Sequence, residues 1–70
     1  MGIRKGDKVK WEWGNGTAEG EVTETFQKKV TRTIKGNEVT RDGSQDDKAL
    51  MIEQEDGDRV LKLESEVNKQ

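Results

Sequence analysis

Apolar and polar residues alternate one by one along residues 8–13, with the sequence KVKWEW. This period of two is typical of a half-buried β-strand, in which successive side chains point to opposite faces. The next three residues are Gly14-Asn15-Gly16, and glycine and asparagine accept the positive φ angles of tight hairpin turns. The alternation then continues over residues 17–26. The chain is therefore predicted to open with a β-hairpin.

Two residues interrupt the pattern of the second predicted strand. Glu24 falls on the same face as the apolar Ala18 and Val22, so we expect the strand to bend or leave the core near this position. Gly20 lies in the middle of the strand, where glycine indicates a kink or the close approach of another backbone. Both features are common where a sheet curves.

Three later segments are predicted to be strands. Residues 30–34 are rich in β-branched side chains, and residues 60–63 form the last apolar strand. Residues 49–52 are a continuous apolar run, which is typical of a central strand covered on both faces. A turn at residues 35–38 leaves residues 39–41 as candidates for renewed pairing.

The remaining segments are predicted to be loops and one helical turn. Residues 42–48 form a polar loop without periodicity, and Asp56-Gly57 is a hairpin turn sequence. Leu63 and Val67 are four positions apart, so residues 63–67 can close with a single helical turn. Residues 68–70 are expected to be a frayed tail.

The strand count and the spacing of the turns define the fold class. About five short strands, with turn sequences roughly every eight to twelve residues and no long helix, predict an all-β protein. A chain of 70 residues is too short for a β-sandwich. We therefore expect a single domain over residues 1–70, a five-stranded small barrel with a core over about residues 4–67. One short helical turn is expected near its C-terminus.

The composition excludes most catalytic and metal chemistry. The chain has no histidine and no cysteine, which removes the commonest general base and the commonest transition-metal ligands. Its many carboxylates are joined by no convincing nucleophile, and nucleotide-binding glycine motifs are missing. The acidic turns lack the spacing of a calcium loop. We predict that the protein is not an enzyme and holds no metal or cofactor.

The charge distribution argues against a dedicated nucleic-acid binder. Residues 1–41 carry nine basic and six acidic residues, and residues 42–70 carry four basic and nine acidic ones. The net charge of −2 lacks the basic excess that phosphate binding requires.

No apolar run exceeds four residues, whereas a membrane span needs ~20. We therefore expect no membrane segment and a cytoplasmic location.

Several stretches resemble a known family. Gly6–Trp11 and the segment GNGTAEGEV at residues 14–22, followed by residues 31–44 and 50–66, are similar to the hypervirulence-associated protein Tudor domain family. The resemblance implies a Tudor-like, SH3-like barrel, in a family of small bacterial and fungal proteins of uncharacterised activity. Tudor domains that recognise methylated side chains use about three or four aromatic rings around the cation. This chain has three aromatic residues in all, so a complete cage is not expected.

The two tryptophans share one face of the first strand. Core packing is favoured for Trp11, and slightly favoured for Trp13, whose position beside the hairpin turn leaves exposure and ligand stacking open. A candidate binding surface consists of Trp13 as apolar contact, Arg59 as hydrogen-bond donor and Phe26 at the rim.

Basic residues gather around the third predicted strand: Lys28, Lys29, Arg32, Lys35 and Arg41. They form an alternative, phosphate-binding patch, with Trp13 or Phe26 stacking a base. A solvated face balanced by acidic residues is favoured, because the whole chain has no basic excess.

Three functions remain open from the sequence. The preferred one is a non-catalytic, monomeric interaction module that binds a protein segment through an exposed strand edge or a groove beside Trp13. The alternatives are a nucleic-acid-binding small barrel that uses the basic residues, and a structural protein that associates with itself.

Overall fold

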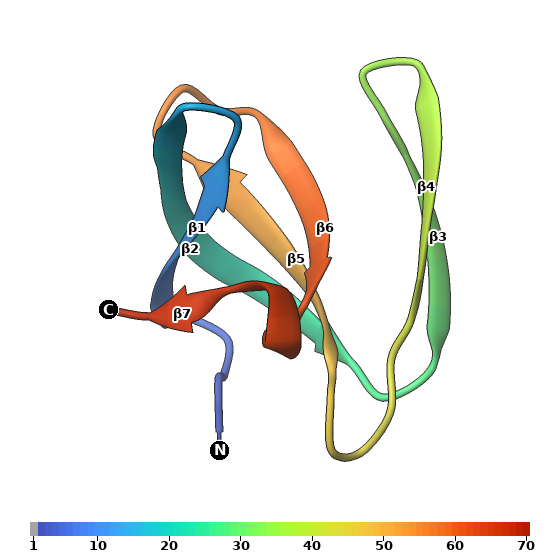
Figure 1. The fold of residues 1–70 in the computed structure, drawn as a ribbon. Coiled ribbons are helices and arrows are strands. Elements are labelled where there is room, and N and C mark those ends of the chain that lie inside the picture. Colours follow the sequence, from blue (N-terminus) through green and yellow to red (C-terminus); the bar gives the residue numbers. More distant parts are fainter. Residues whose placement is uncertain (1) are drawn as a thin grey trace.

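A computed structural model describes residues 2–70 and contains seven β-strands and one 3-10 turn (Figure 1). The elements are β1 (Lys8–Trp13), β2 (Gly16–Phe26), β3 (Lys29–Ile34), β4 (Asn37–Asp42), β5 (Ala49–Gln54), β6 (Arg59–Leu63), η1 (Glu64–Glu66) and β7 (Asn68–Lys69). The protein is all-β, as predicted. In the part of the chain that the structure describes, no helix has the length and apolarity that a membrane crossing requires.

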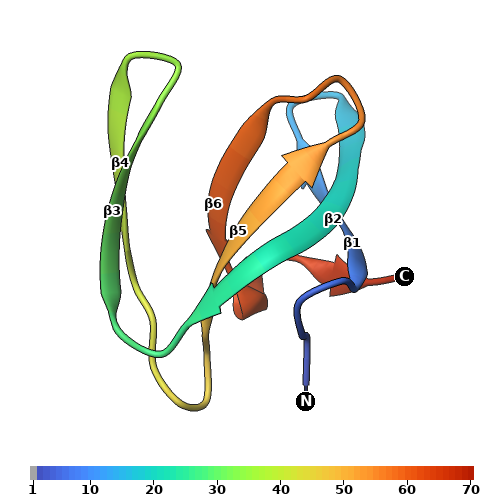
Figure 2. The same ribbon diagram turned by 180° about the vertical axis from the view of Figure 1, so that it is seen from behind.

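The strands form two antiparallel sheets instead of the expected five-stranded barrel. One sheet has the order β6-β5-β2-β1-β7, and β3 and β4 form a separate two-stranded ribbon. Figure 2 shows this ribbon standing beside the curved main sheet. The sheets do not close into a barrel, and the predicted count of five was wrong. Residues 37–42 form a complete strand with β3, and the C-terminal tail adds β7.

The C-terminal tail is paired and does not fray. Val9 of β1 faces Lys69, Lys10 faces Asn68, and the backbone N–H of Gln70 donates to the Lys8 carbonyl at 2.9 Å. The 3-10 turn η1 falls inside the predicted helical turn at residues 63–67 and carries the chain from β6 across to β1 (Figure 1). The expectation of a frayed tail was wrong because β1 offers it an unpaired strand edge.

One face of the main sheet carries the first core cluster. Cross-strand partners lie side by side on the same face of a sheet. Trp11 is the partner of Ala18, and Val22 is the partner of Ile52. Ile3 and Val67, near the two ends of the chain, cover this cluster. Its buried members are Ile3, Val9, Trp11, Ala18, Val22, Leu50, Ile52 and Val67. Trp11 is only 4% exposed, which confirms the prediction of core packing.

The other face of the sheet carries a second cluster, which the ribbon covers. Its buried members are Val30, Ala49, Met51 and Leu61, and Phe26, Ile34, Val39 and Leu63 pack around them half-buried. Residues 49–52 of β5 alternate between the two clusters, because successive side chains of a strand point to opposite faces. The prediction of a central strand covered on both faces is confirmed.

Strand β2 bends where the sequence indicated. Val22 pairs with Ile52 and Glu24 with Met51, so Thr23 is an extra residue in a β-bulge. Its hydroxyl donates to the Met51 carbonyl at 3.2 Å. The bulge moves Glu24 from the face of Val22 to that of Met51, where it is exposed to solvent, so the carboxylate is not buried in the first cluster.

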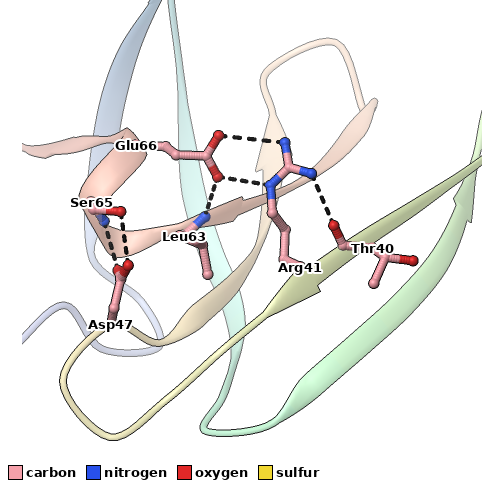
Figure 3. Close-up of polar contacts among 6 residues, drawn as sticks. All are labelled: Thr40, Arg41, Asp47, Leu63, Ser65 and Glu66. Atoms are coloured by element: carbon pink, nitrogen blue, oxygen red, sulfur yellow. Dashed lines mark hydrogen bonds and ion pairs between the residues drawn. The ribbon is translucent and has the colours of Figure 1, made fainter.

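An ion pair fastens the base of the ribbon to the turn after β6 (Figure 3). The Arg41 Nε of β4 donates to Glu66 Oε1 at 2.8 Å, and Glu66 Oε1 also accepts the backbone N–H of Leu63 at 2.8 Å. The same turn is tied to the loop before β5, because Asp47 accepts the Ser65 backbone N–H at 2.9 Å and its hydroxyl at 2.8 Å.

A second ion pair joins the tip of the ribbon to the main sheet. Lys35, in the turn between β3 and β4, places its Nζ 2.6 Å from the carboxylate of Asp58, which precedes β6. The Arg32 guanidinium of β3 lies 5.2 Å from the centre of the Phe26 ring, a cation–π distance. Polar contacts therefore hold the ribbon at both ends, and apolar contacts hold it between them.

The close approach at Gly20 gives a stability prediction. A Cβ at this position would lie 2.5 Å from the Glu53 carbonyl oxygen and 2.7 Å from the Ile52 side chain. We expect Gly20→Ala to lower the free energy of unfolding by about 1–3 kcal/mol, as overpacking does. Gly16→Ala on the same strand is the control, since nothing lies within 4 Å of its Cβ. Urea denaturation measures both, and equal midpoints would contradict the predicted contact.

The pKa of Glu66 gives a pH prediction. Partial burial raises this pKa, but the hydrogen bonds from Arg41 and from the Leu63 N–H lower it by more, so the net shift is below the ordinary 4.5. A carboxyl with a lowered folded-state pKa stabilises the fold above its unfolded pKa and loses this contribution as pH falls through the folded value. We expect Glu66→Gln to be less stable than the parent near neutral pH by up to about 1 kcal/mol.

The difference between parent and Glu66→Gln should shrink as the pH falls below 4.5, as chemical denaturation at several pH values can show. Glu38→Gln is the control, because Glu38 lies on the outer face of the same ribbon and takes part in none of the described ion pairs. A stability gap for Glu66→Gln that stays constant down to strongly acidic pH contradicts the assignment.

Candidate functional site

Trp13 is the exposed aromatic residue of the molecule. It ends β1, and 63% of its surface is accessible to solvent. Its cross-strand partner is Gly16, which has no side chain to cover the indole. Strand β5 pairs with β2 only from Gly20 onward, so the hairpin tip extends beyond β5. The slightly favoured expectation that Trp13 packs in the core was therefore wrong, and the exposed alternative holds.

The other two residues of the predicted binding surface lie elsewhere. Phe26 ends β2, at the far end of that strand from the hairpin tip, and packs half-buried against the second cluster. Arg59 begins β6, is exposed, and faces Glu53 of β5. Gly16, the cross-strand partner of Trp13, and Phe26 are the first and last residues of the eleven-residue strand β2. The structure does not bring the three side chains together in one surface.

The five basic residues around β3 are divided between the faces of the ribbon. Arg41 is the cross-strand partner of the buried Val30, so it lies on the inner face; Arg32 lies there too, over the Phe26 ring. Lys29 faces Asp42 on the outer face.

The last two basic residues lie at opposite ends of the ribbon. Lys35 is paired with Asp58 at the tip, and Lys28 precedes β3 and is exposed. Because three of the five basic side chains already have partners, this arrangement does not favour a continuous phosphate-binding face.

A row of charges crosses the main sheet, which sequence reasoning missed. Four directly opposed residues on neighbouring strands have the charges plus, minus, minus, plus: Lys8, Glu21, Glu53 and Arg59. Lys8, Glu21 and Glu53 of this row line an open hollow of about 340 Å³, together with Glu19 and Glu55. Only the order and register of the strands bring these residues together. Among residues 2–70, no group of three or more carboxylates is arranged to hold a metal ion.

A larger hollow of about 690 Å³ lies between the N-terminal segment and η1, with Ile3 and Val67 among its lining residues. Two of its acidic residues, Glu64 and Asp47, accept hydrogen bonds that stabilise the fold. Glu64 accepts the backbone N–H groups of Ile3 at 3.2 Å and Lys48 at 3.0 Å, and Asp47 accepts both donors of Ser65. These carboxylates hold the chain ends and the loop before β5 in place, so the hollow is not a strong ligand site.

Comparisons with known proteins identify the family. The family model described as "Hypervirulence associated proteins TUDOR domain" matches residues 6–67, from the turn before β1 to the end of η1 and the following valine. Searches of curated proteins and of solved structures give no significant match. The matched region contains Trp13, both sheets apart from β7, and the complete ribbon. The chain therefore belongs to the hypervirulence-associated protein Tudor domain family.

Proposed function

We propose that this chain is a non-catalytic interaction module that binds a protein segment, with Trp13 as its apolar contact. Membership in a Tudor-like family supports a small interaction module in general. The observation that carries the proposal is the 63% exposure of Trp13 in a protein whose other large apolar side chains are buried or half-buried among residues 2–70. Tryptophan is enriched among the residues that dominate binding energy at protein interfaces.

The surroundings of Trp13 leave room for a partner. A Cβ built at Gly14 or at Gly16 has nothing within 4 Å apart from its chain neighbours, so the turn beside the exposed indole is uncrowded. Tryptophan offers a large, rigid apolar surface with a polar N–H at one edge, which suits contact with a peptide. A segment that covers Trp13 removes this surface from water. Each Å² of apolar area buried in this way contributes a favourable free energy of roughly 25 cal/mol.

The arrangement of the rings does not favour a cage for methylated side chains. Trp11 is buried in the first cluster, Phe26 lies beneath Arg32, and Trp13 stands alone at the hairpin tip. A cation cage needs several rings around one point. The proposed contact is therefore a single apolar anchor, and its selectivity comes from groups around the hairpin.

A displayed library of random peptides, selected on the folded protein, tests the proposal. We expect selected peptides whose affinity changes little between low and high salt, since the contact is apolar. Trp13→Ala should weaken them by about tenfold or more, as loss of a central aromatic contact does. The matched control is Glu12→Ala, which changes the neighbouring exposed residue on the other face of β1.

Two results would contradict the proposal. One is the absence of any enriched peptide, and the other is equal affinity of the parent and Trp13→Ala for the enriched peptides. Trp13→Ala should keep the urea midpoint of the parent, because the side chain is largely exposed. Salt-sensitive binding of a fluorescent single-stranded DNA, with no peptide enriched, would favour the nucleic-acid alternative instead.

A further inference from the structure

Strand β6 forms one edge of the main sheet, and the hydrogen-bond pattern of the β5–β6 hairpin shows which backbone groups point outward. The Gln54 N–H donates to the Asp58 carbonyl at 2.7 Å. In an antiparallel ladder, hydrogen-bonded and non-hydrogen-bonded pairs alternate. The Met51–Leu61 and Glu53–Arg59 pairs are therefore the non-hydrogen-bonded ones. It follows that the N–H and C=O groups of Leu61 and Arg59 point away from β5.

Leu63 confirms this assignment and connects β6 to the ribbon. Being two residues after Leu61, it also points its backbone away from β5, and its N–H donates to Glu66 Oε1 at 2.8 Å. The same Glu66 oxygen accepts Arg41 Nε from β4. A side chain therefore occupies the place at β6 where a neighbouring strand would bind.

Strand β4 offers a second free edge, next to β6. The Gly43 N–H donates to the Lys28 carbonyl at 3.1 Å, so by the same alternation Thr31–Thr40 is a non-hydrogen-bonded pair. The backbone groups of Thr40 then point away from β3, and the Thr40 carbonyl accepts Arg41 Nη1 at 3.0 Å. Figure 3 shows that the Arg41–Glu66 ion pair satisfies one backbone group on each of the two edges.

Between these contacts, the backbone of Leu61 is left without a partner. The residue is only 2% exposed, its N–H and C=O point away from the ladder with β5, and none of the hydrogen bonds described for residues 2–70 involves either group. Buried backbone groups are nearly always paired, because leaving them unpaired away from water is unfavourable. The edge of β6 is therefore incomplete at Leu61, in the region that the ribbon covers.

We propose that the edge of β6 at residues 59–61 takes an extended segment of a partner protein as an added strand. The Arg41–Glu66 ion pair then acts as the latch that opens to let the ribbon move aside. The occupant is a protein segment because alternating N–H and C=O groups at strand spacing are matched by another extended backbone. This inference rests on the proposed function, because both require the chain to bind a protein segment. The binding edge proposed here is distinct from the Trp13 hairpin.

The surroundings of the edge specify the segment. Alternate side chains of an added strand fall on the side of Leu61, Ile34 and Val39, where the second cluster is apolar, so apolar residues fit every second position. Arg59 is exposed and takes part in none of the described ion pairs, so an acidic residue of the segment fits opposite it. The expected segment alternates apolar residues and carries a carboxylate near the Arg59 end.

A pair of substitutions at one position tests the added strand with the enriched peptides as probes. Arg59→Pro removes an outward N–H without breaking a bond to β5, and Arg59→Ala removes the same side chain but keeps the N–H. We expect amide spectra of the ¹⁵N-labelled protein to shift at residues 59–61 when a peptide binds. Arg59→Pro should weaken binding by about tenfold or more relative to Arg59→Ala, because the ring also blocks the approaching strand.

A latch variant keeps the test decisive if Arg59→Pro fails to fold. Arg41→Gln breaks the ion pair with Glu66 and frees β4 and the Thr40 carbonyl, while the edge of β6 itself stays unchanged, so this variant should bind the peptides several-fold more tightly than the parent. Unchanged or weaker binding by Arg41→Gln would overturn the latch and the need to move the ribbon.

The outcomes separate the inference from the proposed function. One outcome is that the peptides shift the NMR signal of the Trp13 indole N–H and leave the amide signals of residues 59–61 unchanged. That result overturns the inference and keeps the proposed function. Peptides that bind the β6 edge and are indifferent to Trp13→Ala support the inference and remove Trp13 from the function. No enriched peptide overturns both.

Discussion

The double burial of strand β5 is the constraint on which the rest of the structure depends. Leu50 and Ile52 are fully buried in the cluster that contains Trp11, while Ala49 and Met51 are buried in the cluster under the ribbon. A chain with 27% apolar residues cannot build one thick core. It builds two thin ones on the two faces of a single curved sheet, and β5 belongs to both. The ribbon exists in this arrangement as the cover of the second face.

Because the core is divided in this way, the edges of β4 and β6 are not joined by a ladder. Side chains bind some of their backbone groups instead. The β3–β4 ribbon contributes Val30 to the second cluster, but no ladder joins it to the main sheet. The Arg41–Glu66 pair takes the place of such a ladder at one point, and Lys35–Asp58 links the tip. Both pairs are partly exposed, so each stabilises the fold modestly. The ribbon is therefore attached to the main sheet through side chains and not through a backbone ladder.

Much of the fold follows from local patterns in the sequence. The alternation of residues 8–13, the glycine turn after it and the apolar run at residues 49–52 gave the first hairpin and the central strand correctly. Glu24 on an apolar face indicated the bulge, and Gly20 the close contact with β5. The hairpin and the central strand depend on neighbours along the chain. The bulge and the close contact depend on single residue types, because a carboxylate avoids an apolar core and only glycine leaves room for a close backbone.

The features that sequence reasoning missed depend on pairing between distant segments. Residues 30–34 have the composition of any strand, and nothing local shows that they pair with β4 alone. The tail at residues 68–69 is polar, and its pairing arises because β1 has a free edge. The candidate site was predictable only in part. Trp13 was identified, but its exposure depends on where β5 ends, and its separation from Phe26 depends on the length of β2.

Tryptophan fluorescence of two single-tryptophan variants tests the central claim most directly, that Trp11 is a core residue and Trp13 an open surface. Trp11→Phe leaves Trp13, which should emit at long wavelength and be quenched readily by iodide and acrylamide. Trp13→Phe leaves Trp11, which should emit at shorter wavelength and resist both quenchers, because it is only 4% exposed. If Trp13 instead emits at short wavelength and is shielded, the hairpin tip is covered and the account of this molecule as an interaction module built around it is contradicted.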